Sequence, residues 1–128
     1  MADAPQKRIV LVEDDQFISN MYVTKLQITG FDIKHAEDGD VGIELIRQEK
    51  PDLVLLDILM PRKSGFEVLE EMKADPTLKD IPVILLTNLS QKEDVDRGLQ
   101  LGAKDYLIKA HFTPKEVVEK INKVLGLQ

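Results

Sequence analysis

The chain has 128 residues, no cysteine and a formal net charge of −6 at pH 7. This length fits one domain, and without cysteine neither a disulfide framework nor a thiolate metal site can form. No apolar run approaches the roughly 20 residues that span a bilayer, and the polar start MADAPQKR is not a secretory signal. An acidic chain is also poorly suited to broad binding of nucleic-acid phosphates. We therefore expect a cytoplasmic protein without membrane insertion or direct nucleic-acid binding.

Residues 1–6 are small and polar and predict a flexible leader, whereas residues 7–128 predict a single domain. Within that domain, short aliphatic runs alternate with segments of helical periodicity. Uninterrupted apolar runs of this length are typical of strands that are covered on both faces. The runs are Ile9–Val12, Ile33–Ala36, Leu53–Leu56, Val83–Leu86 and Tyr106–Ile108.

Apolar residues between these runs recur at helical spacing, which predicts five helices. In the first such segment Ile18, Met21, Tyr22 and Leu26 share one face, which we expect to pack on the core. The acidic Asp15 stands directly before this segment, where it is expected to cap the helix.

Further along the chain, three pairs of residues have the spacing of a capping box, in which a hydroxyl and a carboxylate satisfy the first turn of a helix. The pairs are Ser64 with Glu67, Ser90 with Glu93, and Thr113 with Glu116. Strict alternation of five short strands with helices implies parallel pairing and right-handed crossovers. The predicted fold class is therefore α/β, a doubly wound five-stranded parallel sheet with five helices.

Polar residues stand where the predicted strands end. In an open parallel sheet the carboxyl ends of the strands share one edge, where ligands gather. These residues are Glu13, Asp14 and Asp15 after the first strand, Asp57 after the third, Thr87 and Asn88 after the fourth, and Lys109 after the fifth.

Clustered carboxylates repel one another, and a hard cation such as Mg²⁺, which prefers oxygen ligands, relieves that repulsion. An aspartate can also act as a nucleophile toward a phosphoryl group, whose charge a cation and a lysine then neutralise. This set of side chains suits phosphoryl transfer onto an aspartate, and it lacks the arrangement of a catalytic triad. His35 and His111 have no second ligand at a metal spacing, so we expect both at the surface.

Four blocks of the sequence, in order, resemble the receiver domain of bacterial and archaeal response regulators over Arg8 to about Leu125. The blocks are RIVLVEDD, PDLVLLDILMPRKSGFEVL, IPVILLTN and GAKDYLIKA. The resemblance implies a flavodoxin-like sheet with strand order 2-1-3-4-5. It also implies a protein that is phosphorylated on aspartate by a sensor histidine kinase or a phosphotransfer protein.

The resemblance also assigns roles to individual residues. Asp57 matches the phosphorylated aspartate. Mg²⁺ would be held by Glu13, Asp14, Asp57 and the backbone carbonyl of Leu59, which matches the residue two places past the phosphoacceptor. Thr87 matches the switch hydroxyl, Lys109 the lysine that contacts the phosphoryl group, and Tyr106 the switch aromatic.

Two positions depart from the usual pattern of the family. Ala110 follows Lys109 where proline, often in a cis peptide, is usual, and this favours a trans bond. Asn88 follows Thr87 where a small residue is usual, so its amide can add or obstruct a contact with the phosphoryl group.

The favoured function is a phosphoacceptor switch that shifts the surface of the fourth helix, fifth strand and fifth helix to control an unknown partner protein. Such a protein is not an enzyme with a separate substrate, and it would be a monomer or a weak dimer through that surface. Two alternatives stay open: a Mg²⁺-dependent phosphohydrolase, and a module whose interactions do not depend on phosphorylation. The chain is either a stand-alone regulator or a piece of a longer protein.

Overall fold

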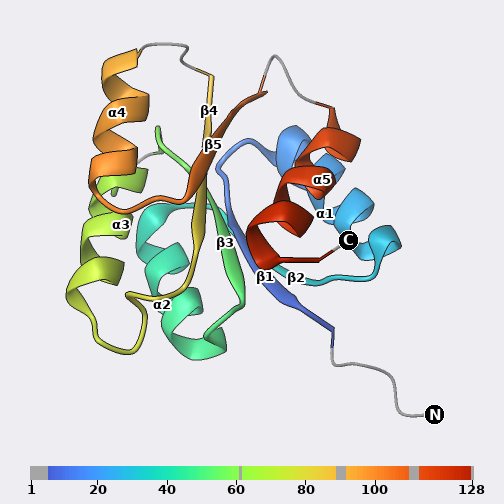
Figure 1. The fold of residues 1–128 in the computed structure, drawn as a ribbon, viewed down its shortest axis with the longest axis horizontal. Helices are drawn as coiled ribbons and strands as arrows, with labels where there is room; N and C mark the ends of the chain where they lie inside the picture. Colours follow the sequence, from blue (N-terminus) through green and yellow to red (C-terminus); the bar gives the residue numbers. More distant parts are fainter. Residues whose placement is uncertain (1–5, 61, 89–91, 110–112, 128) are drawn as a thin grey trace.

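Five parallel strands form one sheet in the order β2-β1-β3-β4-β5 (Figure 1). The structure, a computed structural model, describes residues 6–60, 62–88, 92–109 and 113–127. The strands are β1 (Arg8–Val12), β2 (Asp32–Ala36), β3 (Leu53–Asp57), β4 (Val83–Thr87) and β5 (Asp105–Ile108). The helices are α1 (Gln16–Thr29), α2 (Gly39–Glu49), α3 (Gly65–Ala74), α4 (Lys92–Gln100) and α5 (Pro114–Leu125). The predicted fold class and strand order are confirmed.

The sheet separates two layers of helices, with α1 and α5 on one face and α2, α3 and α4 on the other (Figure 1). Successive residues of a strand point to opposite faces, so each strand contributes to both layers. In β1, Ile9 and Leu11 pack in the core under α1 and α5, whereas Val10 and Val12 pack in the core under α2 and α3. This double coverage explains why the central strands are apolar without interruption.

The predicted helix starts are confirmed wherever the structure describes them. The Asp15 carboxylate accepts a hydrogen bond of 3.0 Å from the N–H of Ile18 at the start of α1. Capping boxes begin α3 at Ser64 and α5 at Thr113. Ser90, of the third predicted box, lies outside the described residues.

The prediction for α1 is wrong at Met21. The buried residues of this helix are Ser19, Tyr22 and Leu26, whereas Met21 is 38% exposed. Ser19, Tyr22 and Leu26 are three and four residues apart and form the face of the helix that the sheet covers. Met21 lies beside that face and is left partly exposed. None of the helices in the described ranges is long and apolar enough to cross a membrane.

Gly65, the first residue of α3, packs directly against the end of β3. Its N–H donates a hydrogen bond of 2.8 Å to the Ile58 carbonyl. A Cβ atom on Gly65 would overlap the Asp57 carbonyl oxygen and would lie 2.8 Å from the Ile58 Cα. The absence of a side chain at Gly65 therefore sets how closely α3 approaches the residue predicted to accept a phosphoryl group.

We expect Gly65→Ala to lower the free energy of unfolding by about 1–3 kcal/mol, because its new methyl group meets backbone that cannot move aside. Gly98→Ala is the comparison, since its Cβ would meet the Cδ1 atom of Leu85, the end of a flexible side chain. Urea unfolding followed by circular dichroism measures both. An equal or smaller loss in Gly65→Ala would show that α3 shifts freely on β3.

Candidate functional site

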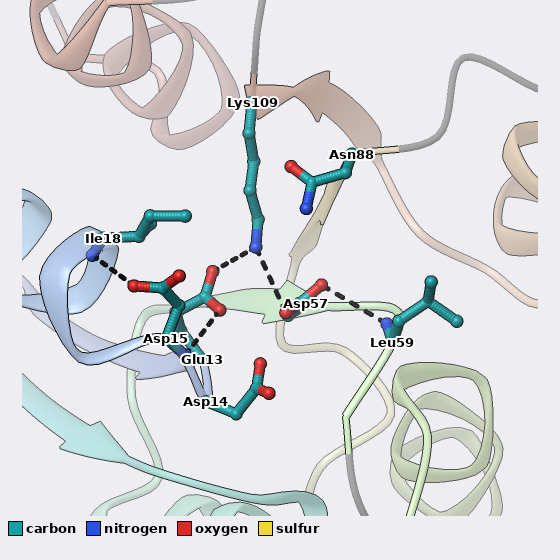
Figure 2. A pocket seen from close by; sticks show the side chains of 8 residues that line it. All are labelled: Glu13, Asp14, Asp15, Ile18, Asp57, Leu59, Asn88 and Lys109. Carbon is teal, nitrogen blue, oxygen red and sulfur yellow. Dashed lines mark hydrogen bonds and ion pairs between the residues drawn. The ribbon is translucent and has the colours of Figure 1, made fainter.

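The polar residues at the carboxyl edge of the sheet line a pocket of about 180 Å³. They come from the β1–α1 turn, from the end of β3, and from the residues that follow β4 and β5 (Figure 2). The lining residues are Glu13, Asp14, Asp15, Ile18, Asp57, Leu59, Asn88 and Lys109. The predicted metal and phosphate residues Glu13, Asp14, Asp57, Leu59 and Lys109 therefore do meet in one place.

A single buried ammonium group joins two buried carboxylates in this pocket. The Lys109 Nζ forms an ion pair with Glu13 Oε1 and lies 3.1 Å from Asp57 Oδ2. Figure 2 shows the lysine side chain descending from the end of β5 to a point between the two acids. Because all three side chains are buried, these charges interact more strongly than a surface pair does.

The charges in the pocket shift the protonation of its members. Burial and then the nearby Glu13 carboxylate raise the pKa of Asp57 to about 8, against the opposing effect of Lys109. Burial alone would lower the pKa of Lys109, but the Glu13 and Asp57 carboxylates outweigh it and hold that pKa above its ordinary value. The pocket therefore carries more negative charge than one lysine neutralises.

The acidic residues of the pocket fit a divalent cation. One carboxylate oxygen from each of Glu13, Asp14 and Asp57 lies within 4.8 Å of the others. The fully buried Glu13 Oε1 forms an ion pair with the Lys109 ammonium, and the Glu13 carboxylate also interacts with the neighbouring Asp57. Mg²⁺ prefers carboxylate oxygens of this kind, and it would offset negative charge that one lysine does not neutralise. Figure 2 shows the Asp14 carboxylate pointing into the same space.

Leu59 borders the pocket through its main chain. Its N–H donates a hydrogen bond of 3.3 Å to Asp57 Oδ1, while its side chain is 58% exposed. The β3–α3 segment therefore turns back over the Asp57 carboxylate. The predicted role of the Leu59 carbonyl as a metal ligand stays a prediction.

Thr87 and Tyr106 do not line the pocket. Thr87 is the last residue of β4 and is 1% exposed, and only its neighbour Asn88 reaches the pocket. Asp57 is paired with Leu86, which packs under α1 and α5, whereas Thr87 is one residue further along. Because residues alternate along a strand, Thr87 belongs to the face covered by α2, α3 and α4.

Tyr106 also belongs to the face covered by α2, α3 and α4. It is paired with Leu85 and packs, half-buried, against the core on that side. The phosphoacceptor candidate and the two switch candidates thus lie on opposite faces of the sheet. Ala110, whose peptide bond with Lys109 was predicted to be trans, lies outside the described residues, as does His111.

One site residue was misjudged from the sequence. His35 was expected at the surface, but it is partly buried and its Nε2 lies 2.8 Å from the Glu13 carbonyl oxygen. His35 is the second-last residue of β2, and the carboxyl end of β2 lies at the same edge of the sheet as the acidic β1–α1 turn. This position was the signal that could have placed it near the site. Ile18 was also missed, although it is the third residue of the helix that Asp15 caps at the pocket.

A family model described as the response regulator receiver domain matches residues 9–122. The chain belongs to this family. It is a receiver domain of two-component response regulators, a class of signalling switches. The phosphate regulon transcriptional regulatory protein PhoB of Escherichia coli is 40% identical over 119 residues, which cover 93% of this chain and 52% of PhoB. The transcriptional regulator RpaA of a Synechocystis strain is 37% identical over 92% of this chain and 48% of its own. This receiver domain therefore spans about half the length of the curated relatives it matches.

Solved receiver structures share the whole fold of this domain. The chemotaxis protein CheY4 of Vibrio cholerae superposes with a TM-score of 0.88 at 25% identity, covering 94% of this chain and 99% of CheY4. The Mn(2+)-bound form of response regulator Rcp1 gives a TM-score of 0.79 at 32% identity, covering 91% of this chain and 92% of Rcp1.

We expect the metal-free receiver domain to lose stability as the pH rises. With a raised pKa, folded Asp57 keeps a proton that the unfolded chain releases, so this contribution is full below the ordinary pKa of 3.8 and is lost as the pH passes about 8. At about pH 9 in EDTA, Asp57→Asn should be roughly 1–3 kcal/mol more stable than the wild type, because a neutral amide carries no buried charge. The difference should shrink toward about pH 5.

Urea unfolding of the two proteins over this pH range measures the difference in their free energy of unfolding. Adding Mg²⁺ at high pH should restore the stability of the wild type and leave that of Asp57→Asn unchanged. A gap that is constant with pH would show that Asp57 does not carry the raised pKa.

Proposed function

We propose that this receiver domain is a phosphoacceptor switch in which Asp57 accepts a phosphoryl group from a sensor histidine kinase or a phosphotransfer protein. The supporting observation is the buried Asp57 carboxylate, held 3.1 Å from the Lys109 ammonium in an acidic pocket at the carboxyl edge of the sheet. A buried carboxylate paired with one lysine among excess acids is expensive to maintain. A role for Asp57 as the group that reacts with an incoming phosphoryl group would explain why this cost is kept.

The transfer follows from the groups in the pocket. An Asp57 carboxylate oxygen attacks the phosphorus of a phosphohistidine, the phosphorus–nitrogen bond breaks, and the donor imidazole leaves with the electron pair and takes up a proton. Lys109 then exchanges its ion pair with Asp57 for one with a phosphoryl oxygen, so the ammonium stays paired throughout. The Asn88 amide, which points toward the pocket in Figure 2, lies where it can donate to a second phosphoryl oxygen.

Mg²⁺ would be held by Glu13, Asp14, Asp57 and the Leu59 carbonyl. When bound, it neutralises charge on the phosphoryl oxygens and on the acids. Glu13 would contribute a buried carboxylate oxygen, and Asp14 the exposed carboxylate at the mouth of the pocket. The relative Rcp1 has a Mn(2+)-bound form, which supports binding of a divalent cation by this domain.

The output of the switch would pass through Thr87 and Tyr106 to the surface formed by α4, β5 and α5. Thr87 is paired with Ile108 and precedes the pocket residue Asn88, so movement of its hydroxyl toward a phosphoryl group would leave space beside Tyr106. The Tyr106 ring lies 6.0 Å beneath the Lys120 ammonium of α5, at the edge of that surface. A partner protein, or a second copy in a weak dimer, would read the altered surface in the cytoplasm.

The domain would not turn over a separate substrate. A phosphohydrolase with an aspartate nucleophile needs an acid two residues past it, and that position is Leu59, which carries no proton to donate.

Incubation with acetyl phosphate and Mg²⁺ should add one phosphoryl group to the wild-type protein, as measured by intact mass. Asp57→Asn removes the nucleophile and should add none, and EDTA should suppress the adduct in the wild type. Loss of the adduct on treatment with hydroxylamine would identify an acyl phosphate. An unchanged adduct in Asp57→Asn would refute the assignment of this residue.

The phosphorylated protein should lose its phosphoryl group over hours at neutral pH, because Leu59 cannot orient an attacking water. Leu59→Asn supplies an amide at the same position and should speed the loss roughly 3- to 10-fold. Release of inorganic phosphate from the purified phosphoprotein measures the rate. Leu127→Asn, at a partly exposed leucine near the end of α5, is the matched control. Loss from the wild type within minutes would contradict this expectation.

A further inference from the structure

His35 holds the main chain of the acidic turn from the neighbouring strand. It is paired with Leu11 in the β1–β2 register, and its Nε2 lies 2.8 Å from the Glu13 carbonyl oxygen. A carbonyl oxygen only accepts hydrogen bonds, so the His35 Nε2 must carry the proton. Both the neutral Nε2–H ring and the imidazolium satisfy this condition, and the contact therefore does not depend on the charge of the ring.

This contact extends the pairing of the two strands beyond its last backbone partner. The β1–β2 register ends at Val12 and Ala36, and the Glu13 N–H donates a final hydrogen bond of 3.0 Å to the Ala36 carbonyl. Past that point the chain leaves the sheet, and the Glu13 carbonyl accepts from a side chain instead. Both polar groups of the Glu13 main chain are thus tied to β2.

The peptide that His35 holds joins two of the three acids of the candidate metal cluster, Glu13, Asp14 and Asp57. Its carbonyl belongs to Glu13 and its N–H to Asp14, so the plane of this peptide sets the direction in which both side chains leave the chain. The Glu13 carboxylate is further fixed by the Asp15 N–H, which donates to Oε2 at 3.1 Å. Asp14 is exposed at the mouth of the pocket. The direction of its carboxylate therefore depends mainly on the orientation of its backbone.

We propose that His35 is a positioning residue of the metal site, which fixes the Glu13–Asp14 peptide so that both carboxylates face Asp57. The inference rests on the proposed function, because it requires that these acids bind a divalent cation. Partners that orient metal ligands through hydrogen bonds typically contribute 10- to 100-fold in metal affinity. Since His35 acts on the backbone rather than on a ligand atom, we expect an effect of roughly tenfold, at the lower end of that range.

The test compares variants of similar size that differ in their ability to donate. His35→Met and His35→Leu remove the donor, whereas His35→Gln keeps an N–H at a similar reach. Lys34→Gln changes the exposed neighbour on the same strand and is the control. Isothermal titration with MgCl₂ gives the affinity of each protein, and urea unfolding in EDTA gives its stability without the metal.

We expect His35→Met and His35→Leu to bind Mg²⁺ about tenfold more weakly than the wild type, and His35→Gln and Lys34→Gln to stay within about twofold. Phosphorylation of His35→Met by acetyl phosphate should be slow at low Mg²⁺ and should recover at saturating Mg²⁺. A purely structural role would lower stability in EDTA and leave the Mg²⁺ affinity unchanged, and that result would overturn the inference. An equal loss in His35→Gln would do the same, because the hydrogen bond would not be the cause.

Mg²⁺ binding by the wild-type protein separates this inference from the proposed function. Failure of the wild type to bind Mg²⁺ would remove the metal site itself and the inference with it. Binding by the wild type that is unaffected by the loss of the His35 donor would refute the inference alone.

Discussion

The ion pairs of Lys109 with Glu13 and Asp57 are the interaction on which the site depends. Buried carboxylates of two strands cannot lie this close without a cation, and β5 supplies one from two strands away. Only a long side chain reaches across the end of β4 to both acids. The lysine neutralises part of the negative charge of the pocket and leaves an excess on a cluster of three acids that could hold a metal ion. The pKa of Asp57 is raised first by its burial and then by the nearby Glu13 charge.

Much of this arrangement was predictable because it depends on local rules. Uninterrupted aliphatic runs identify strands buried on both faces, and parallel strands place their carboxyl ends at one edge whatever their order. Glu13, Asp57 and Lys109 could therefore be brought together from their positions along the chain alone. The capping residues Ser64 and Thr113 follow from the same kind of short-range pattern.

The features that the sequence did not predict depend on contacts between distant elements. Helical spacing shows that Met21 lies near an apolar face, but only the fit of α1 on the sheet decides which neighbouring residue is covered. The role of His35 depends on the exact β1–β2 register, which no single residue reveals. The separation of Asp57 from Thr87 follows from strand alternation, but it needs the observed pairing with Leu86 to become visible.

The alternation of the strands has a consequence for how this domain can diverge. The chemistry of the pocket lies on the face under α1 and α5, whereas Thr87 and Tyr106 pack on the face under α2, α3 and α4. In the proposed switch, the effect of phosphorylation passes from one face of the sheet to the other between Asn88 and Thr87, which are adjacent in the chain. Under that proposal, substitutions in α1, which is not part of the surface formed by α4, β5 and α5, could alter which protein delivers the phosphoryl group while that surface keeps its response. A related receiver domain could therefore accept the phosphoryl group from a different donor protein while it keeps the same output surface.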